Sequence, residues 1–166
     1  MTLFDTGKIA GAGLDLDTLV NRVLERCIES TDATKGAVFL LNPYTEQLEL
    51  GAAEGLAPAP PFHRHKGIFG ALLDEEKPIL RREYPKEYKG QHEFEPESLV
   101  ACAIHHDSVP VGLLMIGDRA GGAPFNGGHL HLLQGIALQV APAISHARAK
   151  AEEAAAAAHN RHFVTF

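Results

Sequence analysis

The stretch from Ser98 to Asp118, SLVACAIHHDSVPVGLLMIGD, predicts a β-hairpin in the second half of the chain. Residues 98–105 and 109–118 are two mainly apolar runs, and His106, Asp107 and Ser108 separate them. Two such runs around a short polar turn are typical of paired antiparallel strands. We therefore expect a sheet that is built from antiparallel hairpins.

A second pair of strands is predicted closer to the N-terminus. Residues 36–41 form a nearly continuous apolar run that Asn42 and Pro43 close, and residues 48–53 return toward it. A run of this kind indicates a strand that is covered on both faces. Between residues 54 and 97, six prolines leave room for one helix, near Gly67 to Glu76. A loop region of this length usually has a function.

A helix is expected before the first strand. The apolar residues between 16 and 28 repeat at the i, i+3, i+4 spacing of one buried stripe, and Asp15 or Asp17 is placed to cap the first turn. The stripe consists of Leu16, Leu19, Val20, Val23, Leu24, Cys27 and Ile28.

The last helix is predicted to begin after Asn126, which is a good N-cap residue. Phe125 and Leu130 have the spacing of a hydrophobic staple. Counted from Gly127 the helix exceeds 30 residues, so its second half is expected to project from the domain. Pro142 is expected to produce a kink or a local break.

Length, charge and cysteine content limit the possible classes of protein. A chain of 166 residues has the size of one domain. A net charge of -6 offers no basic surface for nucleic acid or anionic lipid, so neither is an expected partner. No apolar run approaches the length of about 18 residues that a membrane span needs. Cys27 and Cys102 form no disulfide framework, which is typical of a cytoplasmic protein.

The order of helix, paired strands, loop region with one helix, hairpin and closing helix resembles a GAF domain between about Leu14 and Ala149. The short sequence motifs that carry the resemblance are LDLDTL at 14–19, GIFG at 67–70, KPI at 77–79, SLV at 98–100 and VPVGLL at 109–114. The resemblance implies an α+β fold. Its antiparallel sheet has five or six strands, with the terminal helices on one face and a small-molecule pocket on the other.

The resemblance places a candidate ligand pocket around the single mid-chain helix. Alternation along the strand puts Ser98 and Val100 on one face. The alternative is that these side chains fill the space themselves and bind nothing. The candidate pocket residues are Phe62, Ile68, Phe69, Leu72, Ser98 and Val100.

The C-terminal residues 160–166 resemble those that lead into the phosphoacceptor helix of sensor histidine kinases. With the GAF resemblance, we expect an N-terminal helical lead-in at 1–13, a GAF domain at 14–149 and an Ala-rich signalling helix at 150–166. The C-terminal resemblance implies an output kinase domain in cis. The alternatives are an arbitrary helix end, or the GAF domain of a cyclase, a phosphodiesterase or a transcription activator.

Heptad spacing in the last helix predicts a parallel homodimer. Leu3, Phe4 and Ile9 add to the interface if they form a helix beside it. The predicted seam consists of Ile144, Ala147, Ala151, Ala154 and Ala158.

Several GAF subgroups fit the residues less well. The cyclic-nucleotide subgroup has an Asn-Lys pair, a later Phe and then an Asp-Glu pair. This sequence offers Asp118-Arg119 and Phe125, but His129-Leu130 stand where the acidic pair would be. Neither Cys27 nor Cys102 precedes a histidine, as the bilin-attachment cysteine commonly does.

An enzyme is a further alternative, because the GAF-fold reductases of free methionine sulfoxide need two thiols. Cys27 and Cys102 lie at apolar core positions, so we expect structural cysteines and no catalytic residues.

Ten histidines raise the question of a metal or haem site, above all at His63 and His65. On the last helix His129 and His131 diverge by about 200° and cannot chelate together. Solvated loop histidines are the expected outcome, with no metal site and no required cofactor. Arg64, His65 and Lys66 are either a solvated run or a cationic rim for an anionic ligand.

Overall fold

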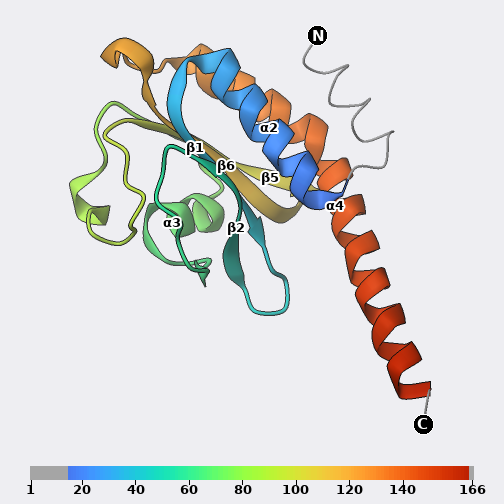
Figure 1. Ribbon diagram of the computed structural model, residues 1–166. Coiled ribbons are helices and arrows are strands. Elements are labelled where there is room, and N and C mark those ends of the chain that lie inside the picture. Colours follow the sequence, from blue (N-terminus) through green and yellow to red (C-terminus); the bar gives the residue numbers. More distant parts are fainter. Residues whose placement is uncertain (1–14, 165–166) are drawn as a thin grey trace.

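The computed structural model describes the backbone of residues 15–164 and the side chains of residues 15–150, 152 and 153. A six-stranded antiparallel sheet with the strand order β3-β2-β1-β6-β5-β4 forms its centre. Helices α2 and α4 lie over one face, and α3 with the long loops lies over the other (Figure 1). The elements are α2 (Leu16–Thr31), β1 (Ala33–Leu41), β2 (Gln47–Glu54), β3 (Phe62–His63), α3 (Gly67–Glu75), β4 (Ile79–Arg81), η1 (Lys86–Tyr88), β5 (Leu99–His106), β6 (Val109–Arg119), η2 (Ala120–Gly122) and α4 (Gly127–Val164).

The predicted C-terminal hairpin is confirmed as β5 and β6, which pair from Leu99 opposite Gly117 to His106 opposite Val109. Asp107 and Ser108 form the turn, and their φ angles are 52° and 66°. Two left-handed residues give a turn whose twist matches that of the flanking strands. The turn is therefore one residue tighter than the predicted turn at 106–108.

The sheet separates two apolar layers, which explains why its central strands are apolar on both faces. Val38 and Leu40 point toward α2 and α4, into what we call the helix-side core. Ala37, Phe39 and Leu41 point toward α3, into what we call the α3-side core. This double coverage confirms the α+β architecture that the resemblance implies.

Helix α2 begins at a side-chain cap. Asp15, and not Asp17, accepts a hydrogen bond from the Thr18 amide at 2.8 Å. The predicted apolar stripe faces the sheet, and Leu19, Val20, Val23, Leu24 and Cys27 are all buried. The helix ends at Asp32, whose backbone is left-handed with a φ of 58°.

Helix α4 remains continuous through Pro142 over its 38 residues, so the predicted local break is wrong. Pro142 is exposed, and the carbonyl that its missing N–H would have bonded belongs to Leu138, whose side chain is 77% exposed. Water can solvate a carbonyl at such a position, which offsets part of the cost of the lost hydrogen bond. The C-terminal part of the helix extends beyond the sheet, as predicted (Figure 1).

The start of the predicted dimer seam lies inside the domain. Ile144 is fully buried in the helix-side core, and Ala147 packs against the same core. The assignment of Ile144 to an intermolecular seam is therefore wrong, because its side chain already packs within its own domain. The side chains of Ala151, Ala154 and Ala158, and residues 1–13 with Leu3, Phe4 and Ile9, are outside the described residues.

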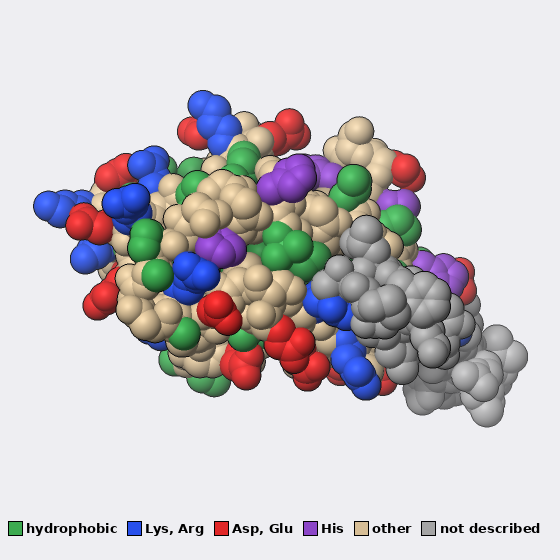
Figure 2. All heavy atoms as spheres, turned by 90° about the horizontal axis from the view of Figure 1, so that it is seen from above, with side chains coloured by type: hydrophobic (Ala, Val, Ile, Leu, Met, Phe, Trp, Pro, Cys, Tyr) green, Lys and Arg blue, Asp and Glu red, His purple; other side chains and the backbone are tan. Residues whose placement is uncertain are grey.

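Charge is unevenly distributed along α4. Residues 120–147 contain no Asp, Glu, Lys or Arg. On the face seen from above, many Lys, Arg, Asp and Glu side chains lie along the left and lower margins, others lie further in beside a histidine, and hydrophobic side chains are scattered among them (Figure 2).

A reciprocal cap fixes the start of α4. The Asn126 side chain accepts from the amides of Gly128 at 2.8 Å and His129 at 3.2 Å, and His129 Nδ1 accepts from the Asn126 amide at 3.0 Å. His129 thus takes the place that Glu or Gln has in a capping box. Phe125 and Leu130 both pack on the helix-side core, which agrees with the predicted staple.

This cap should make stability depend on pH through His129. Burial, and then the positive charge of Arg119, lower the pKa of His129, with Asp32 acting in the opposite direction. The native state then binds fewer protons than the unfolded state just below pH 6.5. The free energy of unfolding therefore has its full value above that pH and falls as the pH drops through it. We expect His129→Gln to keep the cap and to show a smaller decrease of Tm between about pH 7.5 and 5.5.

Scanning calorimetry of both proteins across this range is the measurement. As a control, Asn126→Ala should lower the free energy of unfolding by about 1 kcal/mol at neutral pH. An unchanged pH profile in His129→Gln would show that the imidazole does not titrate with folding.

Candidate functional site

Four of the six predicted pocket residues lie together between α3 and the sheet. Phe62 comes from β3, and Ile68, Phe69 and Leu72 come from α3. All four are buried, with exposed fractions between 0% and 6%, and all belong to the α3-side core. The sequence therefore located the region that α3 covers.

Val100 does not belong to this group, and its predicted placement is wrong. It is fully buried in the helix-side core, on the opposite face of the sheet. Its neighbours Leu99 and Ala101 face α3 instead. Alternation separates the two faces of β5, but because both faces are buried it does not show which one is which.

Ser98 precedes β5 and belongs to a different cluster. Its amide donates to Asp118 Oδ1 at 2.9 Å, while Asp118 Oδ2 pairs with Lys35 Nζ at 2.7 Å. This cluster joins the start of β5 to β1 and the end of β6. Asp118, which the sequence offers in place of the first residue of the cyclic-nucleotide Asn-Lys pair, is thus engaged within the domain.

Aromatic rings occupy the space between α3 and the sheet. Phe39 is at the centre, and its ring centroid lies 5.4 Å from Phe62, 5.9 Å from Phe69 and 5.1 Å from Phe94. The ring of His92 adds to the cluster, 4.5 Å from Phe62 and 4.7 Å from Phe94. We call these five residues the aromatic cluster. It favours the interpretation that the domain's own side chains fill this space.

Three members of the cluster were not predicted from the sequence. Phe39 lies in a continuous apolar strand, where no spacing distinguishes its two faces. His92 and Phe94 lie in the loop between η1 and β5, which has no periodic pattern. The available signal was composition, because Phe94 is an isolated apolar residue in an otherwise charged stretch, and such residues are often buried.

His92 is the unusual member, since it is 9% exposed and its Nε2 is buried without a hydrogen-bond partner in the described part of the chain. Burial, and then the positive charge of Lys66, lower the pKa of His92, while the Lys66 backbone, Glu95 and Glu93 act in the opposite direction. The imidazole is therefore neutral at pH 7.

The loop that contains His92 is organised by one carboxylate. Glu95 accepts hydrogen bonds from the amides of Gly90 at 2.9 Å, Gln91 at 3.0 Å and His92 at 3.1 Å. Three backbone donors on one carboxylate hold residues 90–95 as a compact unit.

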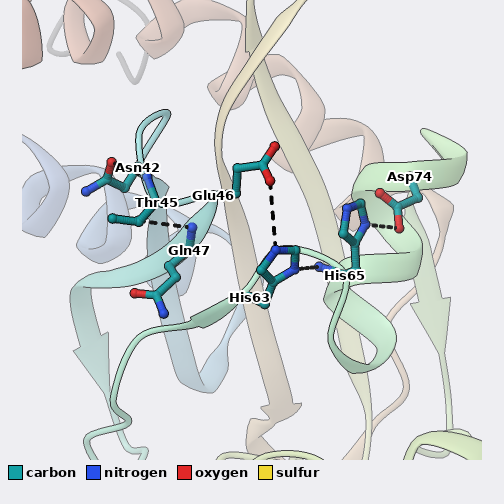
Figure 3. A network of polar contacts seen from close by, with 7 residues as sticks. All are labelled: Asn42, Thr45, Glu46, Gln47, His63, His65 and Asp74. Atoms are coloured by element: carbon teal, nitrogen blue, oxygen red, sulfur yellow. Dashed lines mark hydrogen bonds and ion pairs between the residues drawn. The ribbon is translucent and has the colours of Figure 1, made fainter.

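His63 and His65 pair with carboxylates near α3 (Figure 3). His65 Nδ1 lies 2.7 Å from Asp74, and His63 Nε2 lies 3.9 Å from Glu46. Within residues 15–150, no three His, Cys, Asp or Glu side chains are placed to hold a metal ion together. The two histidines thus link α3 and β3 to the β1–β2 turn through protein carboxylates.

The two cysteines lie in the helix-side core, away from the aromatic cluster. Burial raises the pKa of Cys27, and it raises the pKa of Cys102 to about 12. A buried thiol of this kind is protonated at neutral pH and is a weak nucleophile. This geometry gives no support to a thiol-based reductase.

Comparison with known proteins agrees with the fold. The family model of the GAF domain matches residues 13–145. The chain belongs to the GAF domain family. No curated protein matches it in sequence.

Three solved structures illustrate the likeness of this GAF domain to others. The GAF domain of a phosphoenolpyruvate-protein phosphotransferase from Coxiella burnetii is 20% identical, with a TM-score of 0.76 and coverage of 91% of this chain and 95% of that chain. A methyl-accepting chemotaxis protein is 15% identical, with a TM-score of 0.72 and coverage of 89% and 96%. A free methionine-R-sulfoxide reductase from Neisseria meningitidis, in complex with its substrate, is 12% identical, with a TM-score of 0.74 and coverage of 90% and 89%.

At these identities the likeness shows the fold alone, and one fold hosts several functions. GAF domains are in general regulatory and non-catalytic. No helix within residues 15–164 is long and apolar enough to cross a membrane.

Proposed function

We propose that this GAF domain is a cytoplasmic sensory module of a two-component sensor histidine kinase, and that it passes its signal to a kinase domain in cis through α4. The observation behind the proposal is the division of α4 into two parts. Its first part packs on the sheet, and its second part continues as helix beyond the domain to Val164 (Figure 1).

The boundary between the two parts is anchored at Arg148. Its guanidinium donates to the Leu41 carbonyl at the end of β1, and its Nε lies 3.7 Å from Glu152 on the next turn. One turn earlier, Ile144 is buried in the helix-side core. A displacement of β1 would therefore act on α4 at the point where the helix leaves the domain.

Strand β5 offers a physical route from the aromatic cluster to α4. Leu99 and Ala101 contact the α3-side core, while Val100, Cys102 and Ile104 contact the core under α4. A small ligand that enters between α3 and the sheet has to move some of the aromatic rings. Such a ligand shifts output only if it binds one arrangement of the helices better than the other.

A parallel homodimer is part of the proposal, with its seam beginning beyond Arg148 at Ala151 and continuing through Ala154 and Ala158. Alanine buries little area, and at about 25 cal/mol per Å² such a seam contributes much less than leucine would. A weakly packed seam suits a helix that has to rotate or slide between two states.

The test is a triple variant, Ala151→Leu, Ala154→Leu and Ala158→Leu, in the intact protein. Leucine at these positions should fix the helix pair in one packing, so autophosphorylation should stay at one level whatever the stimulus. Autophosphorylation is measured with purified protein, and circular dichroism confirms that the domain is folded. A triple variant that responds with unchanged amplitude would contradict the proposal.

The alternative outputs are a cyclase, a phosphodiesterase or a transcription activator. A phosphoacceptor histidine helix directly after Phe166 in the intact protein would favour the kinase. A different output domain directly after Phe166 would contradict the kinase assignment, but it would be compatible with signal transfer through α4.

A further inference from the structure

His92 has a buried, unpartnered nitrogen in the middle of an aromatic cluster. Its ring stacks on Phe94 with an interplanar angle of 26° and lies against Phe62 and Phe69. Nε2 is buried without a partner among the described residues. Burying such an atom without a partner costs folding free energy that a purely apolar ring would avoid, so its presence calls for an explanation.

The surroundings of Nε2 oppose a positive charge. A Cβ on Gly67, the first residue of α3, would lie 2.6 Å from Nε2, so the nitrogen lies close to the N-terminal end of this helix. Lys66, the N-cap, makes no side-chain capping bond there. The positive end of the helix dipole and the Lys66 charge both disfavour imidazolium at this place.

Among the described residues, the other charged groups that act on the pKa of His92 are on its own loop. Glu93 is exposed, and the Glu95 carboxylate is occupied by the three loop amides. Both carboxylates and the Lys66 backbone favour the protonated ring, but less strongly than burial and the Lys66 charge oppose it. From β3 and α3, the rings of Phe62 and Phe69 face His92.

We propose that His92 is a proton-operated latch: the neutral imidazole holds residues 90–95 against the aromatic cluster, and its protonation releases this loop and opens the space beneath α3. The domain then opens on acidification. Only the further step, in which this opening changes the output of a kinase, rests on the proposed function. Because Glu95 ties the loop amides together, residues 90–95 move as one unit when the ring leaves.

The direction of the pH response follows from the pKa of His92, which lies below its ordinary value of 6.5 in the closed form. Once the ring is in water, the pKa returns to its ordinary value. As the pH falls through 6.5, the open form therefore gains protons before the closed form does. Opening increases over this interval and levels off below the pKa of the closed form.

The experiment is a pH titration of the 166-residue chain between about pH 7.5 and 5.0, where the carboxylates stay largely ionised. Amide NMR signals of Gly90, Gln91 and His92 report whether residues 90–95 keep their closed position against the aromatic cluster. Binding of a dye that recognises exposed apolar surface reports whether the aromatic cluster opens.

We expect the three amide signals to shift and dye binding to rise several-fold below pH 6.5. His92→Phe, which keeps an aromatic ring in the cluster, should abolish both changes. His92→Gln, which does not titrate, serves the same purpose if phenylalanine does not fit. His129→Gln is the matched control and should open as the wild type does.

Unchanged loop signals in the wild type, or the same transition in His92→Phe and His92→Gln, would overturn the latch. Autophosphorylation of the intact protein is then measured over the same pH range. Opening without any change of autophosphorylation would contradict the use of this opening as a stimulus and leave the latch standing, so the two proposals fail separately.

Discussion

Replacing Phe39 by alanine should lower the free energy of unfolding by about 3–5 kcal/mol. Phe39 lies on β1 in the middle of the sheet, is 1% exposed and contacts the rings of Phe62, Phe69 and Phe94. Removing its ring costs the transfer free energy of the side chain and leaves a cavity that α3 and the sheet cannot fully close. Denaturant unfolding monitored by circular dichroism measures the change.

Tyr44 provides the matched control for Phe39. It is aromatic but 82% exposed, so Tyr44→Ala should change the free energy of unfolding by no more than about 0.5 kcal/mol. A loss below about 1 kcal/mol in Phe39→Ala would show that the rings do not form one packed cluster.

Replacing Ile144 by alanine should cost about 2–5 kcal/mol, and the loss should not depend on protein concentration. The reason is that Ile144 packs against its own sheet, where it is fully buried. Leu138, which is also on α4 but 77% exposed, is the control, and Leu138→Ala should change stability by about 0.5 kcal/mol or less.

Unfolding curves at several protein concentrations distinguish the two possible roles of Ile144. If the residue belonged to a dimer seam, Ile144→Ala would weaken association, and the midpoint of unfolding would depend on concentration more than in the wild type. That result would restore the predicted seam and contradict the packing described above.

The elements with local signals could be predicted from the sequence. The hairpin of β5 and β6, the Asn126 cap and the buried stripe of α2 are each encoded by residues close together in the chain. The two-residue strand β3 and the three-residue strand β4 escaped prediction, because segments this short have too few residues to show alternation.

The sequence could not predict in the same way which of the two apolar layers a buried side chain joins. A spacing of three and four residues marks Ile144 as buried, but it is the same spacing whether the helix packs on its own sheet or on a partner helix. Val100 illustrates the corresponding limit for strands that are covered on both faces. His92 reaches the aromatic cluster because its loop packs there in the tertiary structure. A loop has no periodic pattern of apolar residues that would predict such packing.

The central claim is that α4 passes the signal as a rigid helix. It is tested most directly by inserting alanines after Lys150 in the intact protein, from one residue up to about seven, one heptad. Each inserted residue rotates the following helix by about 100° relative to the domain. Autophosphorylation should rise and fall with the helical period and return toward the wild-type level at one heptad. Autophosphorylation that is independent of insertion length would contradict the claim, because a flexible tether does not transmit rotation.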